Sequence, residues 1–174
     1  MGRYLSQGVG SVLKGRRVTW QEGATQEDAM ANTLFDALFA PLAARTDALL
    51  ILPDGTSLSG QGFLALIARQ AHALRAAGVG PGDRVAVQVP KTPEALALYG
   101  AAVAVGAVFL PLNTAYMPEE MGYFLGNATP RLLVCDPARL SDLAPWAALH
   151  GARVLTLDAQ GAGSLTEAAA GQPD

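Results

Sequence analysis

The side chains best placed to contact a small ligand follow two predicted strands of this sequence. Lys91 comes after the apolar run 84–89, and Asn113 and Tyr116 follow the apolar run 107–110. In open α/β sheets, ligands bind in the crevice outside the carboxyl ends of the strands. The spacing therefore makes these three side chains candidates for lining a cleft. The alternatives are a solvated lysine near a helix start and a loop that only closes a turn.

A cluster of three glycines, Gly78, Gly80 and Gly82, invites comparison with a phosphate-binding loop. Such a loop follows a strand and opens a helix, so that free N–H groups at the helix start face the anion. This cluster does the reverse, because it ends the predicted helix 60–77 and opens the predicted strand 84–89. The context therefore predicts a tight turn.

Residues that often act as nucleophiles, metal ligands or acid–base pairs are scattered. Cys135 ends an apolar strand without a partner histidine in sequence, which favours a packed small side chain. His72 and His150 lie far apart and lack neighbouring ligands, so the sequence argues against a structural zinc site. Glu119 and Glu120 are adjacent on a predicted helix and point in different directions. We therefore expect no metal site and assign no catalytic or cofactor-binding residue.

Strand and helix patterns alternate along most of the chain. The strands read as continuous apolar runs, which is typical of a sheet that is buried on both faces. The predicted fold class is α/β, a mostly parallel sheet with helices on both faces. The pattern predicts a hairpin at 48–58, helices at 60–77, 93–105, 117–127, 138–149 and from Ser164, and strands at 84–89, 107–110, 131–135 and 153–157.

The first predicted helix is amphipathic. Asn32 or Thr33 can cap it, and its apolar stripe runs through Leu34, Leu38 and Leu42 with a spacing of four residues. We expect this stripe to face the core.

Composition and charge exclude several classes of protein. Hydrophobic residues make up 51% of the 174 residues and charged residues 16%, which excludes a disordered chain. The net charge of −3 leaves no broad basic face for nucleic acid or an anionic membrane. The uncharged stretch 95–112 is interrupted by Gly106 and Pro111, so it predicts a buried helix and strand rather than a membrane span.

The first 29 residues differ from the rest because they have little apolar periodicity. They lack the apolar segment of a secretory signal, but the first 20 are basic and free of acid, as in a mitochondrial presequence. The alternative is an upstream start codon or a loose tail, with Met30 as the natural start. We therefore expect a tail at 1–29, a domain at 30–174 and a cytoplasmic protein, or a mitochondrial one if the tail is a presequence.

The run Gly-Val-Gly-Pro-Gly-Asp-Arg-Val-Ala-Val reads as the entry to a strand. It resembles the entry strand that is shared across the adenylate-forming acyl-CoA synthetase superfamily. The loop Leu-Asn-Thr-Ala-Tyr and the strand end Val-Cys-Asp-Pro are similar to malonyl-CoA synthetases, as is the start Met-Ala-Asn-Thr-Leu-Phe. These motifs occupy 78–87, 112–116, 134–137 and 30–35, and the resemblance covers 30–174.

The resemblance implies a ligase that works in two steps. A carboxylic acid, with malonate favoured, attacks the α-phosphate of ATP to give an acyl-adenylate and pyrophosphate, and coenzyme A then displaces AMP. Mg²⁺ offsets the charge that develops on the phosphates. ATP, coenzyme A, Mg²⁺ and the acid are therefore expected in the complete enzyme.

The superfamily holds the ATP phosphates with a Thr-Ser-Gly-Thr-Thr-Gly type of loop followed by lysine. No such segment occurs in the 174 residues. We therefore interpret the chain as an incomplete, N-terminal portion of the large ligase domain that is inactive by itself and binds none of these cofactors tightly.

Two other functions stay open. One is a ligase of the same family that acts on another fatty or aryl acid. The other is a non-enzymatic α/β binding module, which would be monodisperse in size-exclusion chromatography of residues 30–174. An incomplete domain would instead expose sheet edges and apolar helix faces, and would aggregate.

Overall fold

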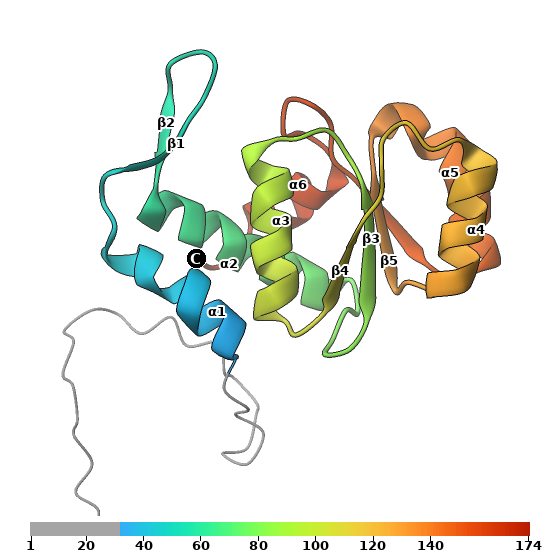
Figure 1. The fold of residues 1–174 in the computed structure, drawn as a ribbon, viewed down its shortest axis with the longest axis horizontal. Coiled ribbons are helices and arrows are strands. Elements are labelled where there is room, and N and C mark those ends of the chain that lie inside the picture. The colour runs from blue at the N-terminus through green and yellow to red at the C-terminus, as the bar shows by residue number, and fades with distance from the viewer. Residues whose placement is uncertain (1–31) are drawn as a thin grey trace, which may run out of the picture. The chain divides into compact units, whose positions relative to one another are not determined.

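The computed structural model describes residues 32–174, and their centre is a four-stranded parallel sheet (Figure 1). The strands are β3 (Arg84–Gln88), β4 (Val108–Pro111), β5 (Leu132–Cys135) and β6 (Arg153–Thr156). Their order in the sheet is β4-β3-β5-β6, so β4 and β6 are its edges. This confirms the predicted α/β class, and each strand agrees with its predicted range to within one residue.

Helices cover both faces of this sheet. One side carries α2 (Gly60–Ala76) and α3 (Pro93–Ala104), and the other carries α4 (Pro118–Ala128) and α5 (Leu140–Leu149) (Figure 1). The last helix, α6 (Ser164–Ala170), packs against α2. Because α3 follows β3 and α4 follows β4, the chain leaves two neighbouring strands toward opposite faces.

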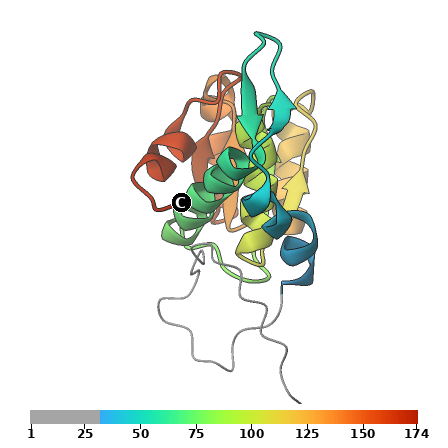
Figure 2. The ribbon, with the colours of Figure 1, turned by 90° about the vertical axis from the view of Figure 1, so that its left-hand side faces the viewer.

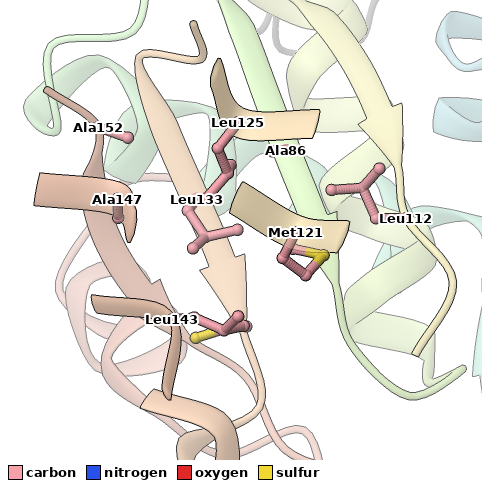
Figure 3. Close-up of a cluster of buried hydrophobic side chains, with 9 residues drawn as sticks. Ala86, Leu112, Met121, Leu125, Leu133, Leu143, Ala147 and Ala152 are labelled. Atoms are coloured by element: carbon pink, nitrogen blue, oxygen red, sulfur yellow. The ribbon is translucent and has the colours of Figure 1, made fainter. Parts of the chain in front are cut away.

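The core on the α4 and α5 side follows from the register of the strands. Ala86 of β3 pairs with Leu133 of β5, and both side chains face the two helices. Met121 and Leu125 come from α4, while Leu143 comes from α5 (Figure 3). Four of these five side chains are bulky and fully buried, which at about 1.5–3 kcal/mol each makes the cluster a main source of stability.

The glycine cluster forms a turn between α2 and β3, as predicted. Gly78 has φ of +83° and Gly82 has φ of +79°, which side chains other than glycine rarely adopt. Asp83 accepts a hydrogen bond from the N–H of Gly80 at 2.9 Å and closes the turn.

The first helix differs from its prediction in length and in its buried face. Helix α1 (Thr33–Leu38) ends before the 3₁₀ segment η1 (Ala40–Ala44), where Pro41 removes an N–H donor. Asn32 caps α1, accepting from the N–H of Phe35 at 3.1 Å.

The expected stripe of leucines in α1 does not face the core. Leu34 and Leu38 are 48% and 52% exposed, whereas Phe35 and Phe39 are buried. The two rings lie 5.6 Å apart, and Phe39 continues to Tyr99 of α3 at 6.0 Å. Aromatic rings bury more apolar area than leucine, so they determine which face packs inward.

A β-hairpin precedes α2 and projects from the body of the described part (Figure 2). Strands β1 (Ala48–Ile51) and β2 (Ser57–Ser59) pair antiparallel around Asp54 and Gly55, as predicted. Asp54 accepts hydrogen bonds from the N–H and the hydroxyl of Thr56 at 2.9 and 2.7 Å, and these bonds lower the pKa of its carboxyl group.

Two further predictions can be compared with the fold. The predicted helix 138–149 is divided into the 3₁₀ segment η2 (Pro137–Arg139) and α5. The uncharged stretch 95–112 forms α3 and β4, and none of the helices in the described part has the length and hydropathy needed to cross a membrane. The tail predicted at 1–29 and the start at Met30 lie outside the described residues.

Candidate functional site

A groove of about 1080 Å³ opens at the carboxyl ends of β3 and β4. The helices that follow these two neighbouring strands leave toward opposite faces of the sheet. In open α/β sheets, ligands bind at such a switch point. Three segments supply its walls: the hairpin, the start of α3 with the residues before it, and the end of β4 with its following loop. Its lining residues are Leu50–Leu52, Val87, Val89–Pro93, Ala95, Leu96, Tyr99, Phe109 and Pro111–Thr114.

The lining is mostly apolar and has one charged group. Lys91 is the cation, and no aspartate or glutamate is among the lining residues. Ile51 and Leu96 are 78% and 47% exposed. The groove therefore complements a ligand that combines an anionic group with an apolar body.

The position of Lys91 follows from the way β3 ends. Pro90 cannot donate to a sheet ladder and stops the strand. Thr92 then caps α3, because its hydroxyl accepts from the N–H of Ala95 at 3.1 Å, and Pro93 occupies the first helical position. Lys91 is held between the strand end and the helix start, with an exposed side chain.

The other two predicted cleft residues are placed differently. Asn113 lines the groove, but its side-chain oxygen accepts from the N–H of Ala115 at 2.9 Å and stays within its own loop. Tyr116 is not among the lining residues. Its ring stacks on Phe124 of α4, with centroids 4.9 Å apart, and packs against the core cluster. The structure therefore brings Lys91 and Asn113 to one groove and places Tyr116 outside the groove lining.

Several lining residues did not emerge from the sequence. Tyr99 and Phe109 are in edge-to-face contact at 5.5 Å and supply two aromatic side chains. The apolar pattern assigned both to a helix and a strand but carried no signal that they border a ligand site. The hairpin residues Leu50–Leu52 were also missed, because sequence periodicity does not show where a hairpin lies relative to a sheet.

The remaining chemically active side chains lie outside the groove. Cys135 is buried at the end of β5, and burial, with Asp136 beside it, raises the pKa of its thiol to about 11. It is thus a neutral packed side chain, as expected. The ring of His150 lies close to Gly126 of α4. Within residues 32–174, no three metal-ligating side chains gather.

Fold and groove define an α/β domain with a groove at the switch point of a parallel sheet, where ligands of such sheets bind. Residues 39–174 match the family of AMP-binding enzymes. The chain therefore belongs to this family, within the adenylate-forming superfamily.

Individual relatives agree with this assignment. The crystal structure of ATP-bound MatB from Rhodopseudomonas palustris is 44% identical, with a TM-score of 0.79 over 83% of this chain. Feruloyl-CoA synthase from an Amycolatopsis species is 38% identical over 94 residues, or 54% of this chain. Enterobactin synthase component F from Escherichia coli is 36% identical over 127 residues, or 69% of this chain. The matches span 29%, 19% and 9% of these proteins, respectively.

The described residues do not fit the triphosphate of ATP. Triphosphate sites combine several cations or Mg²⁺ with free backbone N–H groups at a helix start. The groove has Lys91 alone, and the glycine turn 78–83 ends a helix instead of opening one. We therefore derive no phosphoryl step from this part of the chain.

Proposed function

We propose that this chain is the N-terminal part of an AMP-forming acid–CoA ligase. The observation that carries the proposal is the family match over 39–174, together with alignment of 83% of this chain to 29% of MatB. In the complete enzyme, ATP and the acid would give an acyl-adenylate, and coenzyme A would then displace AMP, with Mg²⁺ as the metal ion. The chain by itself is expected to be inactive, because its described residues lack a triphosphate site.

Malonate is the acid that we propose. The loop Asn-Thr-Ala-Tyr at 113–116 resembles malonyl-CoA synthetases, and the 44% identity to MatB points the same way. A second candidate is an aryl acid, which is favoured by the 38% identity to feruloyl-CoA synthase. The two differ in charge, since malonate carries a second carboxylate that needs a cationic partner.

Within the ligase, this chain supplies scaffold and one wall of a cleft. The groove side chains Lys91 and Asn113 would contact a ligand, and the apolar lining would exclude water from it. Tyr116 would support the wall from the side of α4. From the sequence we expect a cytoplasmic enzyme, or a mitochondrial one if residues 1–29 are a presequence.

The test is an assay of the complete gene product that contains this chain. With ATP, Mg²⁺ and coenzyme A, it should release AMP in the presence of malonate, and the 174-residue chain should release none. AMP release with ferulate but not with malonate would show that the substrate is an aryl acid instead of malonate. Failure to form AMP with any acid would refute the ligase function.

A further inference from the structure

The loop that joins β4 to α4 is held by side chains from elsewhere in the sheet. Gln88 at the end of β3 donates from Nε2 to the carbonyl oxygens of Asn113 and Tyr116 at 2.8 and 3.3 Å. Arg139 of η2 donates to the carbonyl oxygens of Thr114 and Tyr116 at 3.2 and 3.1 Å. Residues at or just after the carboxyl ends of three neighbouring strands, β4, β3 and β5, therefore meet at this loop.

Gln88 reaches the loop from behind the groove. Its neighbours Val87 and Val89 line the groove, whereas Gln88 does not, and it pairs in register with Cys135 of β5. Successive side chains of a strand point to opposite faces, so Gln88 faces the α4 and α5 side. It acts on the groove only through the backbone of residues 113–116.

The burial of Gln88 argues that its amide has a function. The side chain is 1% exposed, and its Oε1 has no hydrogen-bond partner among residues 32–174. An unpaired buried polar atom costs about 1–3 kcal/mol, whereas an apolar side chain of similar size would carry no such cost. An apolar residue at position 88 would, however, lose the two hydrogen bonds that the Gln88 amide donates to the loop.

We propose that Gln88 and Arg139 are positioning residues. They fix the part of the groove wall that Asn113 and Thr114 form. Gln88 holds the loop from the core and Arg139 holds it from the surface. The side chain of Asn113 and the stacked ring of Tyr116 then complete a loop that is shaped before any ligand arrives. The importance of this wall for a substrate rests on the proposed function; the positioning itself does not.

The test uses amide hydrogen exchange in the complete gene product that contains this chain, measured by mass spectrometry on peptides that cover the loop 113–116 and the strands. The amides of Ala115 and Tyr116 donate within the loop and report on its order. In Gln88→Met, which keeps size but removes the donors, exchange at these amides should accelerate about tenfold, from two lost hydrogen bonds. Exchange at Val85 of β3 and Leu133 of β5 should change less than about twofold.

Arg139→Lys gives a second test that does not depend on the core variant folding. Lysine keeps the charge but lacks the planar fork that reaches two oxygens, so the loop amides should again exchange faster. Arg153→Lys is the matched control, because Arg153 donates to the carbonyl oxygen of Ala76, away from the groove.

Equal loop exchange in the wild-type and both variant chains would overturn the proposal, as would an acceleration that is uniform across the sheet. The first result would show that the bonds do not hold the loop, and the second that the two residues serve global stability alone. Neither result depends on ligase activity, so a failure here is distinct from a failure of the proposed function.

Discussion

Lys91 is the charged side chain among the lining residues of the described groove. It is exposed at the mouth of a mostly apolar surface, and no carboxylate among the lining residues competes for it. Lys91 would therefore strengthen the binding of a ligand that carries an anionic group next to an apolar body.

Replacing Lys91 tests this role. In the complete enzyme, Lys91→Gln should raise the KM for the acid by about ten- to a hundredfold, because a hydrogen bond to a charged group contributes about 1.5–3 kcal/mol. Arg75→Gln, which removes an exposed cation outside the groove, should leave the KM unchanged. An equal KM in both variants would exclude Lys91 from the binding surface.

Cys135 makes stability depend on pH at the alkaline end. Its thiol pKa is raised from 9.0 to about 11 by burial, so the folded chain keeps a proton that the unfolded chain releases. The free energy of unfolding should therefore be unaffected by this group below pH 9 and should fall as the pH rises toward 11.

Urea unfolding at several pH values measures this dependence. Because tyrosine and lysine also titrate in this range, the informative quantity is the difference from Cys135→Ala. That variant should lose less stability between neutral and alkaline pH than the wild-type chain. Parallel curves for the two chains would show that the thiol does not contribute.

At the scale of elements, α1 is anchored by its aromatic residues. Phe39 is 7% exposed and contacts Phe35 and Tyr99, whereas Leu38 is 52% exposed. Phe39→Ala should lower the free energy of unfolding by about 3–5 kcal/mol, and Leu38→Ala by less than about 1 kcal/mol. Chemical denaturation of both variants would measure this, and similar losses would support the leucine face that the sequence pattern predicted.

Helix α4 packs closely on α5 through glycines. A Cβ at Gly122 would lie 2.5 Å from Trp146, while a Cβ at Gly126 would lie 3.1 Å from the ring of His150. Alanine gains about 1 kcal/mol in helix propensity, and overpacking costs about 1–3 kcal/mol. Gly122→Ala should therefore be destabilising and Gly126→Ala nearly neutral.

Thermal unfolding of the two glycine variants separates these terms. The rigid indole ring at Gly122 has little room to move, and the imidazole at Gly126 needs to shift by only a few tenths of an ångström. A lower Tm for Gly126→Ala than for Gly122→Ala would contradict the packing described for α4 and α5.

For the molecule as a whole, local patterns were enough to predict the sheet and most of its helices. Gly78 and Gly106 end helices at positive φ, and Ser59 and Thr92 cap the helices that follow them, so each boundary had a local cause. The prediction of the buried face of α1 was wrong, because the spacing of leucines does not reveal the contact of Phe39 with Tyr99, which is 60 residues away.

The groove was only partly predictable for the same reason. Lys91 and Asn113 follow strand ends, which is a local property that the sequence displays. Tyr116 follows a strand end as well, but its ring stacks on Phe124, which packs against the core. The aromatic pair Tyr99 and Phe109, the hairpin wall and the support from Gln88 all depend on contacts between distant segments.

The central claim is that this chain is the N-terminal part of an AMP-forming acid–CoA ligase, and one assay tests it most directly. The complete gene product, incubated with ATP, Mg²⁺, coenzyme A and malonate, is analysed for AMP and malonyl-CoA. We predict that the two products form in equal amounts and only when malonate is present. The absence of AMP formation with malonate and with every other acid tested, in a folded complete protein, would contradict the account.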